Sequence, residues 1–205
     1  AKSQHRGVRP RGGPAWARLI LEPGGATLFH SSAWARVLSL TYGHRPLYLH
    51  FSRGAEPMAL VPLMEVHSFL TGRRGVCLPF SDFCDPLFFE GCAPGEIAAR
   101  LSEIAVERKW KHFEIRTKKS AAFTSKASTS YWGHCLDLQP EHEDLWTGFS
   151  SSVRRALRKA EKSPLQAEVT QSRVSITEFY RLHTQTRRQH GLPPQPISFF
   201  RAIFD

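Results

Sequence analysis

A strongly cationic helix is predicted for residues 150–162, "SSSVRRALRKAEK", because its apolar residues recur at helical spacing. The remaining positions carry five cations and one acid, a net charge of +4: Arg154, Arg155, Arg158, Lys159, Lys162 and Glu161. Arginine binds phosphate through paired hydrogen bonds, lysine binds it as a point charge, and a helix N-terminus favours anions. We therefore predict that Arg154, Arg155, Arg158 and Lys159 bind a phosphate-bearing substrate. A solvated basic face would give the same pattern.

Two carboxylates, Asp82 and Asp85, lie in "LPFSDFCDP", where a predicted strand runs into a turn at residues 78–86. A carboxylate at a sheet edge can orient an acceptor amine or accept its proton, so both are catalytic candidates. Asp also caps turns through its own backbone, which would explain both residues without chemistry. The spacing does not select between Asp82 and Asp85.

A third cluster, Arg187, Arg188 and His190, falls in the last turn of a predicted helix, just before the rigid turn at residues 193–196. Cations there complement the negative end of the helix dipole, which is a sufficient structural reason for them. They could also form an anion or proton-transfer site. His190 is the group in this cluster that would titrate near neutral pH, so we predict it as catalytic and the two arginines as substrate-binding.

Several common signatures are missing from the sequence. It contains no phosphate-binding P-loop, no G-x-S-x-G elbow and no HExxH motif. The four cysteines form no CxxC pair, so we predict no metal site. Apolar neighbours predict that Cys77 and Cys135 are buried thiols.

Composition points to a globular protein with an anionic partner. The chain has 205 residues, 41% of them hydrophobic, and a net charge of +10. Such a surplus suits nucleic acid, a nucleotide-linked substrate or anionic lipid. There is no apolar run of about 18 residues, so we predict no transmembrane segment and a cytoplasmic location.

Residues 15–139 are predicted to form one α/β (α+β) domain. A basic, Gly- and Pro-rich arm at residues 1–14 precedes it. The expected elements are a Ser-capped helix ending at Gly43, a hairpin, further strands, and a helix starting at Pro94. In residue ranges, the strands are 46–51, 57–66, 75–80, 112–116 and 131–138, with a polar loop at 118–130.

Residues 140–205 are predicted to start a second domain. The expected order is a helix at 141–163, a strand at 165–172, a helix from Ser175 to Gly191 and a last helix after Pro196. The last helix carries Phe199, Phe200, Ile203 and Phe204. No later element follows to cover these side chains, so we expect the second domain to be incomplete in this chain.

Four segments are distinctive in combination: "LFHSSAWARVLSLTYGHRPLYL", "LPFSDFCDPL", the basic helix, and "FYRLHTQTRRQHGLPPQPISFF". Together they resemble the FemAB-like branch of the GNAT acyltransferases, the relatives of the peptidoglycan interpeptide-bridge aminoacyltransferases. The resemblance covers roughly residues 16–205. It implies two GNAT-like domains, each a mixed sheet flanked by helices, with the second truncated here. Trp34, from the first segment, is a further substrate-binding candidate.

The resemblance implies an N-acyltransferase or aminoacyltransferase acting on an amine of a peptidoglycan or exopolysaccharide precursor. The acyl donor would be aminoacyl-tRNA or acyl-CoA, with no bound cofactor. Partners would be a nucleotide- or lipid-linked envelope precursor, tRNA, and a membrane surface touched peripherally. Two alternatives remain: a non-catalytic RNA- or anion-binding module, or an inactive fragment.

Overall fold

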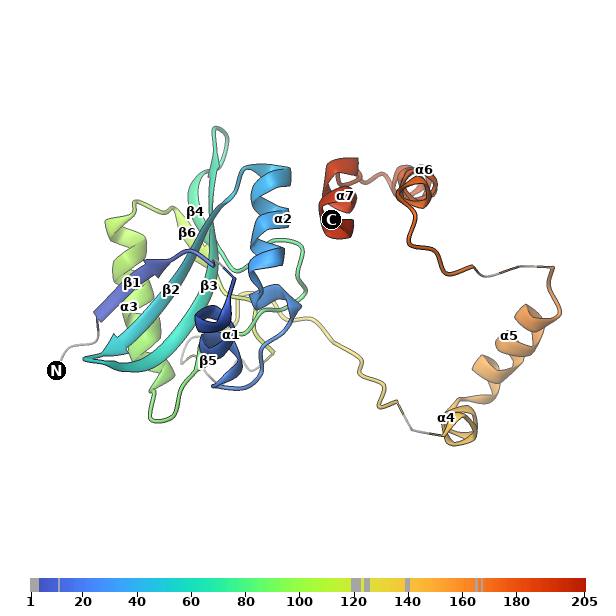
Figure 1. Ribbon diagram of the computed structural model, residues 1–205, viewed down its shortest axis with the longest axis horizontal. Coiled ribbons are helices and arrows are strands. Elements are labelled where there is room, and N and C mark those ends of the chain that lie inside the picture. Colours follow the sequence, from blue (N-terminus) through green and yellow to red (C-terminus); the bar gives the residue numbers. More distant parts are fainter. Residues whose placement is uncertain are drawn as a thin grey trace. The chain divides into compact units, whose positions relative to one another are not determined.

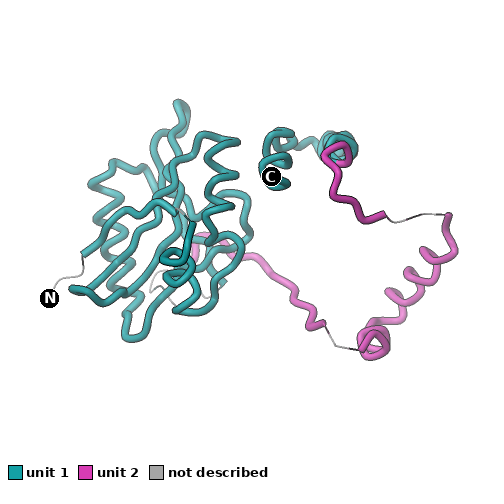
Figure 2. The backbone as a smooth tube through the Cα atoms, viewed as in Figure 1, with its two compact units in different colours: residues 1–126, 176–205 teal, residues 127–175 magenta. Residues whose placement is uncertain are grey.

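A computed structural model of the chain describes residues 4–10, 12–118, 123, 126–138, 141–164, 166 and 168–205. The chain forms two compact units (Figure 2). Unit 1 comprises Ala1–Lys126 and Ile176–Asp205, and unit 2 comprises Ala127–Ser175. The predicted boundary between residues 139 and 140 lies outside the described residues, and the predicted division into two GNAT-like domains stays a prediction.

Unit 1 is built on a six-stranded mixed sheet with the order β1-β2-β3-β4-β6, and β5 pairs with β3 beside β4. All neighbours are antiparallel except β4 and β6, which are parallel. The strands are β1 (Gln4–Val8), β2 (Arg45–Arg53), β3 (Glu56–Ser68), β4 (Gly72–Val76), β5 (Leu87–Phe88) and β6 (His112–Glu114). The predicted mixed α/β fold is confirmed.

The centre of the sheet is the β2–β3 hairpin, which the alternating apolar runs predicted. Gly54 makes the turn with φ 63°, a conformation that favours glycine. Every residue of β3 from Met58 to Val66 is buried, which indicates that both faces of the strand are covered. Helices α1 (Pro14–Leu21) and α2 (Ser32–Tyr42) lie on one side of the sheet, and α3 (Pro94–Glu107) lies on the other (Figure 1).

Helix α2 begins and ends as predicted. Ser31 Oγ accepts a hydrogen bond from the Trp34 N–H at 3.1 Å, and Gly43 ends the helix in the left-handed conformation. The buried face of α2 contributes Trp34, Ala35, Val37 and Leu38 to the core.

Helix α7 (Ile197–Phe204) packs against earlier elements of unit 1, so part of its apolar face is covered without the later element that the sequence led us to expect. Phe199 is only 5% exposed and lies edge-on to Trp34, with ring centroids 5.9 Å apart. Phe200 packs on α6 (Arg173–Gln189) through Phe179 and His183. Ile203 and Phe204 stay about half exposed.

Unit 2 contains helices α4 (His142–Gly148) and α5 (Ser151–Glu161). The single helix predicted for 141–163 is thus broken, because Phe149 and Ser150 adopt extended backbone and Ser150 caps α5. The strand predicted at 131–138 is not formed, and the described residues of 165–172 form none either.

Three further expectations change. Residues 4–8 of the predicted flexible arm form strand β1, because the edge of β2 supplies hydrogen-bond partners from Tyr48 to Ser52. Cys135 is exposed rather than buried, whereas Cys77 is buried as predicted. The predicted polar loop at 118–130 lies partly outside the described residues.

Candidate functional site

The turn that holds both aspartates leaves the sheet at the carboxyl ends of the parallel strands β4 and β6. The strand pairing continues beyond Val76, since the Cys77 N–H donates to the Glu114 carbonyl at 2.8 Å. The chain then bulges out and returns, where the Cys84 N–H donates to the Arg116 carbonyl at 3.0 Å. In many α/β folds ligands bind at this edge of the sheet.

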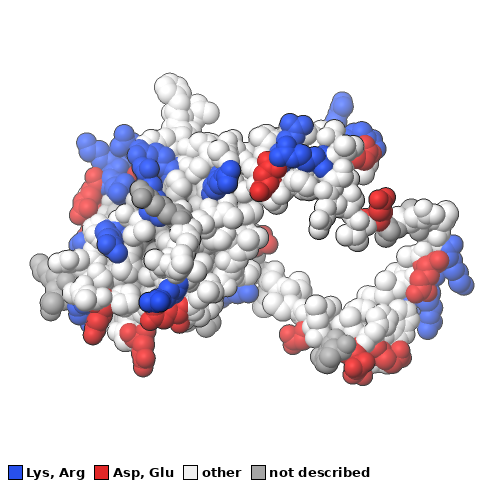
Figure 3. All heavy atoms as spheres, viewed as in Figure 1, with Lys and Arg blue, Asp and Glu red and all other residues white. Residues whose placement is uncertain are grey.

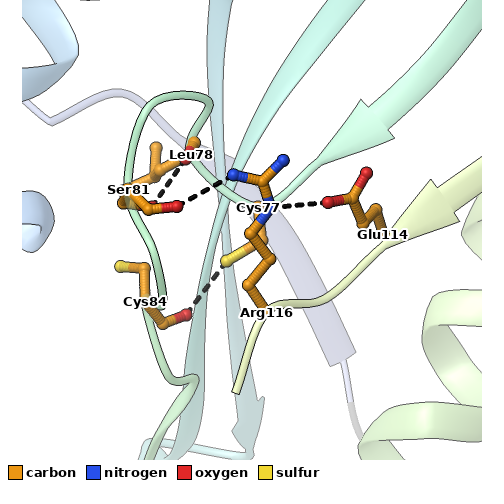
Figure 4. A network of polar contacts seen from close by, with 6 residues as sticks. All are labelled: Cys77, Leu78, Ser81, Cys84, Glu114 and Arg116. Carbon is orange, nitrogen blue, oxygen red and sulfur yellow. Dashed lines mark hydrogen bonds and ion pairs between the residues drawn. The ribbon is translucent and has the colours of Figure 1, made fainter. Parts of the chain in front are cut away.

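The Arg116 side chain supports the loop between Cys77 and Cys84, as Figure 4 shows. Its guanidinium donates to the Ser81 carbonyl at 2.8 Å and pairs with the Glu114 carboxylate at 2.5 Å. The Ser81 hydroxyl donates to the Leu78 carbonyl at 2.6 Å, and the Cys77 thiol donates to the Cys84 carbonyl at 2.9 Å. These contacts lock the backbone that presents Asp82 and Asp85.

The structure separates the two aspartates that the sequence left equivalent. Asp85 Oδ1 accepts hydrogen bonds from the Thr117 hydroxyl and from the Lys118 N–H, the latter at 2.9 Å. Asp82 is exposed and forms no hydrogen bond or ion pair with any residue that the structure describes. Asp85 therefore organises the turn, whereas the Asp82 carboxylate faces solvent, and its predicted catalytic role stays a prediction.

His30 is a functional-looking residue that sequence reasoning missed. It is fully buried, its Nδ1 accepts from the Thr27 N–H at 3.0 Å, and its Nε2–H donates to the Asp85 carbonyl at 2.9 Å. Burial lowers the pKa of His30, so the ring is neutral. The Cys84 sulfur lies 3.6 Å from Nε2, but a side-chain hydrogen bond with Cys77 and burial raise the pKa of the Cys84 thiol. This pair is a structural support for the turn rather than an activated nucleophile. His30 occurs in "LFHSS", and its position directly before the helix cap Ser31 is the one sequence signal that could have singled it out.

In unit 2, three of the predicted phosphate-binding arginines meet. Helices α4 and α5 form an open surface cavity of about 380 Å³ lined by Glu143, Trp146, Thr147, Ser151, Arg154, Arg155 and Arg158. The Arg154 guanidinium donates to the Thr147 carbonyl at 3.3 Å, and the Arg158 guanidinium lies over the Trp146 ring at 5.8 Å. Glu143 is the acid in this lining. Lys159, the fourth predicted residue, lies outside it.

The remaining predicted residues lie in unit 1. Trp34 is buried between Phe29 and Phe199, where it forms part of the core. The Arg187 guanidinium donates to the Pro193 carbonyl at 3.1 Å and so ties the helix end to the proline-rich turn. Arg188 and His190 are exposed. The predicted binding and catalytic roles of these residues stay predictions.

Among the described residues, no group of histidine, cysteine and carboxylate side chains could hold a metal ion. No helix in this part of the chain combines the length and the apolar character that crossing a membrane requires.

Comparison with known proteins shows the fold. No protein family and no curated protein sequence matches this chain. A crystal structure of FemX matches 98% of the chain with a TM-score of 0.59 at 14% sequence identity. This chain has a FemAB-like fold. The fold that the sequence motifs predicted is therefore confirmed, and the chain spans about half of the FemX chain, 54%.

Proposed function

We propose that this chain is part of an N-acyltransferase or aminoacyltransferase that transfers an activated acyl group to an amine of an envelope precursor. The observation that carries the proposal is the arginine-lined cavity of unit 2 in a chain with a FemAB-like fold. Three guanidinium groups around one cavity suit a diphosphate or polyphosphate better than a neutral ligand.

The exposure of the arginines supports a role in binding phosphate. Arg155 and Arg158 are exposed, and Arg154 is held by a backbone carbonyl. The cavity also lies at the N-terminal end of α5, where Ser151 lines it and backbone N–H groups favour an anion. A nucleotide- or lipid-linked peptidoglycan precursor carries a pyrophosphate, and aminoacyl-tRNA carries phosphodiesters. Both classes fit this chemistry, and exopolysaccharide precursors fit it equally.

The reaction needs little covalent help from the protein. A neutral acceptor amine attacks the carbonyl carbon of the donor ester or thioester, a C–N bond forms, and the C–O or C–S bond breaks. The amine loses a proton, which we assign to the exposed Asp82 carboxylate as general base, and the leaving oxygen or sulfur takes up a proton. Positioning of the two substrates supplies much of the rate.

Isothermal titration with a nucleotide-linked peptidoglycan precursor tests the cavity. We expect Arg155→Ala to weaken binding roughly ten-fold, since a hydrogen bond to a charged group contributes about 1.5 kcal/mol or more. The loss should shrink at high salt. Lys159→Ala is the matched control, because Lys159 lies on the same helix outside the cavity and should change binding little.

Equal affinity of the wild type and an Arg154/Arg155/Arg158→Ala variant would exclude the phosphate role. Equal loss in Lys159→Ala would show that the helix acts only through its overall charge. Titration with a short RNA in parallel addresses the alternative of an RNA-binding module: affinity for RNA alone would favour that alternative.

Turnover tests the assignment of the base. Product formation with aminoacyl-tRNA or acyl-CoA as donor, followed by mass spectrometry, should fall about a hundred-fold or more in Asp82→Asn. Normal turnover in Asp82→Asn would remove this carboxylate from the mechanism.

A further inference from the structure

The hairpin between β3 and β4 ends in two large apolar side chains. Phe69 and Leu70 are fully exposed at its tip. The turn is nevertheless ordered by its own hydrogen bonds, because the Thr71 N–H donates to Ser68 Oγ at 3.2 Å and Gly72 takes the left-handed conformation. We call Phe69 and Leu70 the apolar tip.

The apolar tip lies at the apex of a projecting hairpin. In Figure 3 a knob without charged side chains projects from unit 1 at the position of the β3–β4 turn in Figure 1, and blue side chains gather at its base. Single exposed apolar residues are common on protein surfaces. Two adjacent exposed apolar residues at the apex of a projecting, ordered hairpin indicate a surface that binds a membrane or a partner molecule.

Three exposed cations lie in the segments next to the tip, Arg73 directly after the turn and Lys109 and Lys111 in the segment that leads into β6. Arg73 follows the turn directly, and its carbonyl accepts from the Lys111 N–H at 2.9 Å. The Lys111 side chain lies against Gly72, since a Cβ built on that glycine would be 2.8 Å from the lysine Cε. We call these three residues the basic collar.

The segments that carry the basic collar are poor in acids. Residues 66–76 and 108–113 contain no aspartate or glutamate, and the exposed Glu107 lies two residues before Lys109. The adjacent Glu65 is buried and already engaged, because it accepts hydrogen bonds from Arg108 at 3.2 Å and from the Trp110 indole at 2.9 Å. The collar therefore carries an excess of positive charge next to an apolar apex.

We propose that the β3–β4 hairpin docks on an anionic lipid bilayer, with Phe69 and Leu70 inserted at the headgroup boundary and the basic collar binding lipid phosphates. Apolar insertion combined with cations at headgroup level is the arrangement that peripheral membrane binding requires. RNA is the weaker candidate, because Leu70 offers no face for base stacking and Phe69 is a single aromatic. The site is independent of the arginine cavity.

Vesicle co-sedimentation tests the proposal with the whole chain, comparing mixed phosphatidylglycerol and phosphatidylcholine vesicles with phosphatidylcholine vesicles. We expect binding to the anionic vesicles only. Phe69→Ser with Leu70→Ser should abolish it, and Arg73→Glu with Lys111→Glu should weaken it by about ten-fold or more, since each cation near such a surface contributes about five-fold. All four side chains are exposed, so the variants should fold.

Two matched controls make the result decisive. Leu21→Ser with Leu40→Ser removes two exposed apolar residues elsewhere in unit 1 and should leave binding unchanged. Arg18→Glu with Arg36→Glu reverses two exposed charges on helices α1 and α2 and should retain at least half of the binding. Absence of wild-type binding, or loss in the α1 and α2 variant without loss in the hairpin variants, would overturn the proposal. So would binding of RNA, but not of vesicles, through the collar.

Discussion

Helices α2 and α5 have the same length, 11 residues, and the same kind of start, yet they serve different purposes. Ser31 caps α2 by accepting from the Trp34 N–H at 3.1 Å, and Ser150 caps α5 by accepting from the Val153 N–H at 3.4 Å. Helix α2 buries four residues in the core of unit 1, whereas α5 buries none. The same local signals thus form both helices.

The two helices differ in what lies on their surfaces. Helix α2 carries one charged residue, Arg36, and it is covered by β-sheet on one side and by Phe199 of α7 on another. Helix α5 carries its arginines around a cavity that it forms with α4. Burial explains the sequence of α2, and binding of an anion is our explanation for the sequence of α5.

Truncating one leucine in each helix should give the largest contrast. Leu38→Ala in α2 removes a fully buried side chain and should lower the free energy of unfolding by about 2–5 kcal/mol. Leu157→Ala in α5, which is 38% exposed, should change it by about 0.5 kcal/mol or less. Urea unfolding followed by tryptophan fluorescence measures both, and equal effects would show that α5 is buried in solution.

The aspartates of the turn provide the next contrast. Asp85→Ala removes the hydrogen bonds that Asp85 Oδ1 accepts from the Lys118 N–H and the Thr117 hydroxyl, and should cost about 1–3 kcal/mol of stability. Asp82→Ala should stay within about 0.5 kcal/mol of the wild type. If Asp82→Ala is the more damaging change in thermal unfolding, our assignment of the two carboxylates is reversed.

Removing each cap should cost the two helices a similar amount but appear in different measurements. Ser31→Ala should reduce the global stability of unit 1 by about 1 kcal/mol, because α2 is part of its core. Ser150→Ala should leave global stability unchanged and increase amide exchange only in α5. Protection of α5 equal to that of α2 in hydrogen exchange would contradict this.

Acid should destabilise unit 1 through its buried imidazoles. Burial lowers the pKa of His30 below the value near 6.5 of the unfolded chain, so the unfolded state binds the proton more readily. The stability that the neutral ring provides is present above pH 6.5 and is lost as the pH falls toward the lower pKa of the folded state. His30→Gln should flatten this slope in urea unfolding between pH 7.5 and 5, and an unchanged slope would assign it to other groups.

Much of the fold could be predicted because its signals are local. The serine cap and Gly43 define α2, Pro94 starts α3, and the alternation of β2 and β3 gives the hairpin. Strand β1 could not be found in the same way, since its Gly- and Arg-containing sequence is extended only by pairing with β2. The reverse holds for residues 131–138, which alternate like a strand but have no partner strand among the described residues.

The sequence predicted which residues belong to the candidate site but not how they are arranged in space. The arginines of α5 could be selected from their spacing, and α4 could be selected as helical, but the break at Phe149 that forms their cavity gave no clear signal. The choice between Asp82 and Asp85 depends on Thr117 and Lys118, which lie more than thirty residues further along the chain. Contacts between residues so far apart in the sequence form only when the sheet brings their segments of the chain together.

Phe80 joins two distant parts of unit 1 through one ring. Its backbone is left-handed, with φ 64°, an unfavourable conformation for a residue with a bulky side chain. The ring stacks on Tyr42 of α2 at 4.7 Å and contacts Phe199 of α7 at 5.4 Å. The aromatic contacts therefore offset the backbone cost. Whenever α7 detaches, Phe80 loses part of that compensation, so the turn that presents Asp82 and the C-terminal helix are thermodynamically linked and should loosen together.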